Sequence, residues 1–155
     1  MKKLFLNGLR DGIPIALGYL SVGFGFGIFA VSSGLTVLQA VGISASNLTS
    51  AGQFAGLTVI AAGAALIEMV LTQLVINLRY SLMGIALTQK LGTYSLRHRI
   101  LSAFGITDEI FAVSTSKNKS VGRKYMFGLI LTPYAGWSLG TLLGSVAGNI
   151  LPDSV

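Results

Sequence analysis

Long stretches of the chain contain no charged side chain, and they define the first expected elements. No Asp, Glu, Lys or Arg occurs between residues 12 and 67, or between residues 125 and 152. A helix of about 20 apolar residues crosses a bilayer. The first stretch is long enough for two passes and the second for one. The pattern therefore predicts an all-α, polytopic membrane protein.

Small residues recur at helical spacing in the first and last apolar stretches. We expect a helix over residues 13–35, where Gly23 and Gly27 form a GxxxG motif. A second is expected over residues 125–151, where glycines follow one another at steps of four: Gly136, Gly140, Gly144 and Gly148. Small side chains at this spacing let helix backbones approach closely. We assign the four glycines to helix packing rather than to binding.

The segment 36–55 is apolar at its start and polar afterwards, but it carries no charge. Its polar residues include Ser44, Ser46, Asn47, Thr49, Ser50 and Gln53. Composition favours a loop outside the membrane. The absence of charge favours a broken or re-entrant helix that lines a cavity, which is where irregular backbone survives at membrane depth. Both interpretations stay open.

Two further segments have unusual lengths for membrane helices. As one helix, residues 54–87 would be about 50 Å long, so they form either a long tilted helix or a hairpin. Residues 100–116 are short and contain Asp108 and Glu109. Segments 36–55 and 100–116 are both interrupted and polar, and paired segments of this kind are typical of transporter sites. Whether they span or re-enter the membrane stays open.

The excess of positive charge lies at the ends of the apolar stretches. The chain has 11 Lys and Arg against 5 Asp and Glu. The cations form three clusters: Lys2, Lys3 and Arg10; Lys90, Arg97 and Arg99; Lys117, Lys119, Arg123 and Lys124. Such flanking clusters are typical of cytoplasmic loops. We therefore expect a multi-pass protein with a cytoplasmic N-terminus, an even number of crossings between the first two clusters, and no nucleic-acid binding.

Two charges interrupt the apolar run of residues 64–87. On a helix with 100° per residue, Glu68, Thr72 and Arg79 share one face. Gln73 and Asn77 lie on roughly the opposite face, so neither face looks lipid-facing throughout. A charged side chain at the bilayer centre costs about 2.5–3.5 kcal/mol and usually faces the protein interior. We rank Arg79 first among the candidates and Glu68 second, since Glu68 also lies where it can reach headgroups.

The acidic pair of residues 108 and 109 has two compatible interpretations. One carboxylate binds or relays protons while the other pairs with Arg79. Alternatively, Thr107 is a helix N-cap, and Asp108 and Glu109 occupy the favourable first turn.

The sequence contains few of the residues that catalysis or metal binding commonly requires. The chain has no Cys and one His, which leaves no thiolate nucleophile and no His-based metal site. We expect no enzyme activity, no cofactor and no metal.

Several motifs occur in a recognisable order. They are TSAGQFAG (49–56), INLRYSLMGIAL (76–87) and GITDEIFAV (105–113). Together they resemble the AzlC-type family, the large subunit of bacterial branched-chain amino acid exporters. The start GLRDGIPIALGYLSVGFGFGI is also similar to the family's opening. The stretch SVGFG (21–25) stands where a second proline is common, and Tyr80 stands where many members have His.

The resemblance implies a single transmembrane domain over residues 1–155, forming the N-terminal two thirds of the usual family length. The protein would be a multi-pass subunit of a secondary transporter in the bacterial inner membrane. It would export branched-chain amino acids, coupled to the proton gradient, with a small AzlD-type partner subunit. It would contact membrane lipid, and a homo-oligomer stays open. The alternative is a non-transporting membrane assembly subunit that packs through its glycine-rich helices.

An amino acid substrate needs partners for both of its charges. Arg79, or backbone N–H groups at a half-helix start near residues 46–50, would bind the carboxylate. Asp108 or Glu109 would bind the ammonium. The full candidate site is Arg79, Asn77, Asp108, Glu109, Thr107, Gln53, Ser50 and Glu68.

Overall fold

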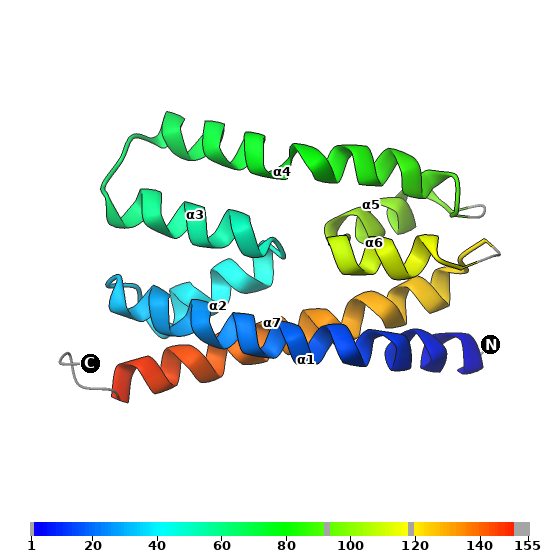
Figure 1. The fold of residues 1–155 in the computed structure, drawn as a ribbon, viewed down its shortest axis with the longest axis horizontal. Helices are drawn as coiled ribbons and strands as arrows, with labels where there is room; N and C mark the ends of the chain where they lie inside the picture. Colours follow the sequence, from blue (N-terminus) through cyan, green and yellow to red (C-terminus); the bar gives the residue numbers. More distant parts are fainter. Residues whose placement is uncertain (1, 92–93, 118–119, 151–155) are drawn as a thin grey trace. The chain divides into compact units, whose positions relative to one another are not determined.

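The computed structural model describes residues 2–91, 94–117 and 120–150 (Figure 1). These residues form seven α-helices: α1 Lys2–Ser32, α2 Val37–Ser46, α3 Ser50–Ala61, α4 Leu66–Thr88, α5 Leu96–Phe104, α6 Asp108–Thr115 and α7 Arg123–Ile150. Within the described ranges, extended pairing is limited to a single bridge between Leu91 and Val121. Helices α1, α4 and α7 are long and apolar enough to cross a membrane. The predicted all-α, polytopic class is confirmed.

The segment 36–55 is helical, so the loop favoured by its composition is wrong. It forms α2 and the start of α3, with a break at residues 47–49. A capping box starts α2: the Thr36 hydroxyl accepts from the Gln39 N–H, and the Gln39 side chain accepts from the Thr36 N–H. Composition missed these helices because uncharged polar side chains can be satisfied inside a packed bundle as well as in water.

The segment 54–87 is a hairpin rather than one tilted helix. Helix α3 ends at Ala61, and α4 begins at Leu66. Gly63 lies between them with φ +61°, in the left-handed region that favours glycine at a helix end. The 64–87 run therefore starts in the turn and continues as α4. The segment 100–116 is also broken, because Gly105–Thr107 separate α5 from α6.

The chain divides into two compact units. Unit 1 comprises Met1–Leu17 and Leu78–Ala135, and unit 2 comprises Gly18–Asn77 and Gly136–Val155. The core of unit 1 forms where α4, α6 and α7 meet; its buried members include Leu87, Ile110 and Leu129. The core of unit 2 brings together residues of α1, α2 and α3, among them Phe26, Ala40 and Leu57. Each unit thus packs a pair of short helices with parts of long ones.

Within each unit, α1 and α7 pack closely through glycines. In unit 2, the α-carbons of Gly140 and Gly144 face the α1 backbone at Leu20 and Phe24. The residue numbers in contact increase together, so the two helices run parallel there. On α1, Gly23 and Gly27 face the α7 backbone. On α7, Gly148 faces Ile28 and Val31, and Gly136 is buried. In unit 1, Gly8 and Gly128 make the same kind of backbone contact.

Helix α4 exposes a continuous apolar face. Exposed large side chains recur along this face at helical spacing: Ile67, Leu71, Leu74, Val75, Leu78, Leu82 and Ile85. The two polar stripes flank an apolar stripe that the packing leaves uncovered.

Candidate functional site

Unit 2 contains a buried chain of uncharged polar side chains. The Ser44 and Thr141 hydroxyl oxygens are 2.7 Å apart, and Gln53 Nε2 donates to Ser44 Oγ at 3.1 Å. Ser44 and Thr141 are fully buried, and Gln53 is 2% exposed. These hydrogen bonds therefore link α2, α3 and α7 through buried side chains.

Several buried polar atoms in unit 2 lack a hydrogen-bond partner. They are Thr49 Oγ1, Gln53 Oε1, Asn77 Oδ1, Trp137 Nε1 and Ser138 Oγ. An unsatisfied buried polar group costs about 1–3 kcal/mol. Their concentration in one unit marks a region with capacity to bind water or a polar ligand.

The first turn of α3 lies beside amide side chains from α4. Gln73 Nε2 donates to the Gly52 carbonyl at 2.7 Å, and Asn77 Nδ2 donates to Gln73 Oε1 at 3.0 Å. Thr49 precedes the helix, but its hydroxyl makes no capping hydrogen bond. Gly52 permits this approach, because a Cβ there would lie 2.8 Å from Gln73 Oε1. A helix start with available N–H groups and neighbouring amides suits an anion such as a carboxylate.

In unit 1, the expected neighbour of Arg79 is found. Arg79 Nη1 lies 2.8 Å from Asp108 Oδ2, and both side chains are about half exposed, at 44% and 49%. Arg79 Nη2 donates to the Tyr80 hydroxyl at 3.2 Å, and the guanidinium lies 5.0 Å from the Tyr80 ring centroid. The Thr107 hydroxyl accepts from the Ile110 N–H at 3.4 Å, so Thr107 is the N-cap of α6.

The candidate residues are divided between the two units. Arg79, Thr107, Asp108 and Glu109 belong to unit 1, and Ser50, Gln53, Asn77 and Glu68 belong to unit 2. Glu68 is exposed in the first turn of α4, where a negative charge is favourable. Ser50 is the exposed first residue of α3. Among the described residues, no group of three His, Asp or Glu side chains is arranged to hold a metal ion.

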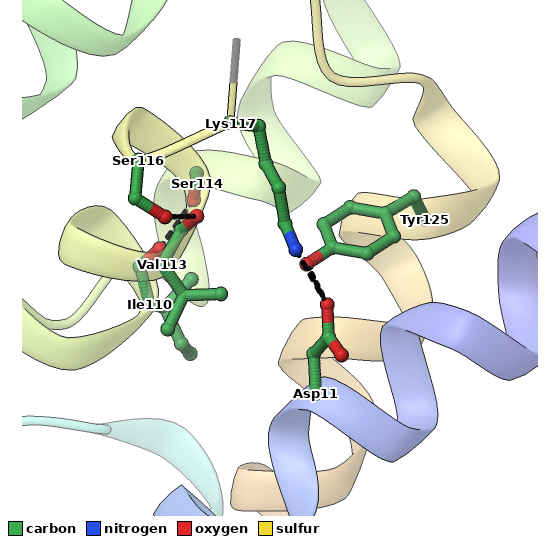
Figure 2. A network of polar contacts seen from close by, with 7 residues as sticks. All are labelled: Asp11, Ile110, Val113, Ser114, Ser116, Lys117 and Tyr125. Carbon is green, nitrogen blue, oxygen red and sulfur yellow. Dashed lines mark hydrogen bonds and ion pairs between the residues drawn. The ribbon is translucent and has the colours of Figure 1, made fainter. Parts of the chain in front are cut away.

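A third polar cluster was not anticipated from the sequence. Asp11 Oδ2 accepts hydrogen bonds from Lys117 Nζ at 2.8 Å and from the Tyr125 hydroxyl at 2.6 Å (Figure 2). The three residues come from α1, from the loop after α6 and from the first turn of α7. The hydrogen bond to Asp11, and secondarily the one with Tyr125, raise the pKa of Lys117 above its ordinary value.

Comparisons with known proteins agree on one family. The family described as AzlC protein matches residues 14–151. Inner membrane protein YgaZ of Escherichia coli K12 is 31% identical over 150 residues, which cover 94% of this chain and 61% of the relative. An uncharacterized membrane protein of Archaeoglobus fulgidus is 35% identical over 148 residues, with 96% and 64% covered.

A more distant relative has a more specific name. The branched-chain amino acid transport protein AzlC of Bacillus subtilis is 24% identical over 149 residues, covering 94% of this chain and 58% of the relative. The chain thus spans less than two thirds of the length of these three relatives. No solved structure matches the chain.

Proposed function

The chain belongs to the AzlC protein family of membrane proteins, and from this premise we propose that it is a transporter subunit that exports branched-chain amino acids. The observation that carries the proposal is the uncapped start of α3 beside Gln73 and Asn77. A broken helix that presents its N-terminus at membrane depth is a recurrent feature of secondary transporters. The name of the Bacillus subtilis relative supports the substrate class.

We assign the substrate carboxylate to the first turn of α3 rather than to Arg79. The Arg79 charge is already matched by Asp108 at 2.8 Å, so a carboxylate there would have to compete with an existing partner. The start of α3 offers backbone N–H groups, with the Ser50 hydroxyl at the helix start and the Asn77 amide nearby. Phe54 lies further along the same helix, is only partly buried, and supplies apolar surface for a branched side chain.

We assign the coupling step to the Arg79–Asp108 pair. Protonation of Asp108 would remove the negative partner of Arg79 and weaken the link between α4 and α6. A carboxylate whose protonation changes an ion pair is a suitable element for proton-coupled transport. Glu109, the next residue of the same turn, is a second carboxylate for the proton or for the substrate ammonium.

The proposed setting is the bacterial inner membrane, with the N-terminus in the cytoplasm and a small AzlD-type partner. Helices α1 and α4 are the two candidate spans between the first basic cluster and Lys90. Two crossings return the chain to its starting side, which agrees with cytoplasmic placement of both clusters. The exposed apolar face of α4 offers area for lipid or for the partner.

The alternative, an assembly subunit that packs through its glycine ridge, has less support. Gly140 and Gly144 already face the α1 backbone of the same chain. A second protein would have to displace α1 to use this surface. We therefore favour transport over pure assembly.

Counterflow in proteoliposomes tests the proposal directly. The chain would be reconstituted with its AzlD-type partner in vesicles. The vesicles would be loaded with unlabelled leucine and placed in a buffer that contains labelled leucine or valine. We expect transient label accumulation above that of vesicles with the partner alone, and a reduced initial rate for Asn77→Ala. Ser81→Ala, an exposed position on α4, is the control. Accumulation no higher than with the partner alone would overturn the transport proposal. A normal rate for Asn77→Ala would remove the α3 start from the site.

A further inference from the structure

Unit 1 contains an open groove of about 800 Å³ between α1, α5 and α7. The basic side chains that line it, and that define its mouth here, are Lys2, Arg123 and Lys124, with the imidazole of His98; no acidic side chain is among the described residues that line it. The remaining walls are apolar and include Phe5, Leu101 and Phe127. The groove therefore combines a positively charged mouth with apolar walls.

The same order of side chains recurs on all three helices. Each carries a basic side chain in its first turn and an apolar side chain three or four positions later: Lys2 and Phe5 on α1, His98 and Leu101 on α5, Arg123 and Phe127 on α7. Residues three or four apart lie on the same face of a helix. Each helix thus presents its basic side chain nearer its N-terminus and its apolar side chain further along, on the face that lines the groove.

The apolar part of the groove continues beyond these residues. A second hollow of about 140 Å³ shares Leu101 and Phe127 with the first and extends to Phe104 and Tyr134. The rings of Phe104 and Tyr134 lie 6.3 Å apart. From Arg123 to Tyr134, α7 rises about 16 Å. This length is close to one leaflet of the bilayer's hydrocarbon core, which is about 15 Å.

We propose that this groove binds one anionic phospholipid. The phosphate lies among the cations at the mouth, and an acyl chain follows Leu101 and Phe127 towards Phe104. Basic pockets between membrane helices are suited to anionic headgroups. The start of α7 also directs its backbone N–H groups towards the same end of the groove as Arg123.

The apolar walls favour a lipid over a soluble anion. Leu101, Phe104 and Phe127 are 53%, 50% and 51% exposed. Free phosphate would engage the cations and leave these side chains in contact with water. A phospholipid covers both parts of the groove at once. The proposal requires no transport activity, so its test is independent of the proposed function.

Native mass spectrometry of the full chain tests the proposal. The protein would be delipidated in a neutral detergent and titrated with dioleoylphosphatidylglycerol or dioleoylphosphatidylcholine, which have identical acyl chains. We expect a one-to-one phosphatidylglycerol adduct at a concentration at least tenfold lower than the phosphatidylcholine adduct. Inorganic phosphate at millimolar concentration should compete weakly. Equal affinity for the two lipids, or efficient displacement by phosphate, would overturn the proposal.

Paired variants separate the groove from general surface charge. Lys2→Gln with Arg123→Gln removes two cations from the mouth and should weaken phosphatidylglycerol binding at least tenfold. Lys3→Gln with Arg99→Gln removes the same charge from neighbouring positions that do not line the groove, and binding should change less than twofold. Equal losses in the two pairs would show a diffuse charge effect and contradict the assignment.

A third variant tests the acyl-chain path without changing charge. Leu101→Trp would fill the point shared by the two hollows, and we expect weaker binding of phosphatidylglycerol. Circular dichroism and a monodisperse elution profile would establish that the variant is folded. A folded Leu101→Trp protein with unchanged affinity would exclude this path for the chain.

Discussion

Arg79 on α4 and Asp108 in the first turn of α6 form an ion pair with a 2.8 Å separation between Nη1 and Oδ2. The pair connects two helices of unit 1 beside Tyr80, which packs against the unit's core. Because both side chains are about half exposed in the chain alone, solvent screening limits what the pair adds to stability. We therefore attribute its importance to the link that it makes between α4 and α6 rather than to its contribution to stability.

This position leads to a first prediction. Arg79→Gln and Asp108→Asn should each lower the initial rate of leucine transport driven by an imposed proton gradient at least tenfold, while each changes the free energy of unfolding by only about 1 kcal/mol or less. The double variant should be no slower than the slower single variant, since the two groups act together. Arg97→Gln, an exposed arginine on α5, is the charge control. Independent, multiplicative effects of the two changes would argue against a coupled pair.

The glycine contacts give a second prediction, about stability. A Cβ at Gly144 would collide with the α1 backbone at Phe24, so Gly144→Ala should destabilise the protein by about 1–3 kcal/mol. Gly25→Ala is the matched control, because nothing lies within 4 Å of the added carbon. There the higher helix propensity of alanine should leave stability unchanged or slightly raised. Denaturant titration in mixed micelles measures both, and equal stability of the two variants would contradict the contact.

The buried hydroxyl pair gives a third prediction. Ser44→Ala leaves the Thr141 hydroxyl without this partner and also removes the acceptor for Gln53 Nε2. We expect a loss of about 1–3 kcal/mol in unfolding free energy. Adding Thr141→Val should restore part of this loss, because one buried group no longer needs a partner. A double variant with the full sum of both single losses would show that the hydroxyls do not interact.

Alkaline pH supplies a fourth prediction. The bond to Asp11 raises the pKa of Lys117 above the ordinary value of 10.5. Because the folded value is the higher one, the stabilisation is complete below pH 10.5 and declines as the pH rises through the folded pKa. Lys117→Gln should lose part of its stability at pH 8 and show a weaker decline above pH 10. A parallel pH dependence in the two proteins would assign the decline to other groups.

The long helices and the Arg79–Asp108 pair were predictable from the sequence for different reasons. Uncharged runs of sufficient length have few alternatives to a membrane helix. An arginine within such a run requires a nearby anion or an interior position, and few carboxylates exist in the chain to serve it. The pair was therefore predictable mainly because the chain has few carboxylates that could be the partner of Arg79.

Other features were not predictable because they depend on distant contacts. Lys117 and Asp11 are 106 residues apart, and no local pattern connects them. In the segment 36–55, Ser44 is hydrogen-bonded by Gln53 and by Thr141, which lies on another helix. Thr141 looked like an ordinary residue of an apolar helix, although it is the partner of Ser44. In each case the decisive partner lies on another helix.

The parallel contact between α1 and α7 has a consequence for biosynthesis. The glycine face of α1 is completed by a helix that emerges roughly 110 residues later, since Gly23 faces Trp137. At ~5–20 residues per second, the ribosome leaves that face uncovered for about ten seconds. During this interval α1 must be shielded by lipid, by insertion factors or by a temporary neighbour. Slowing translation before α7 should therefore increase the fraction of chains degraded before maturation.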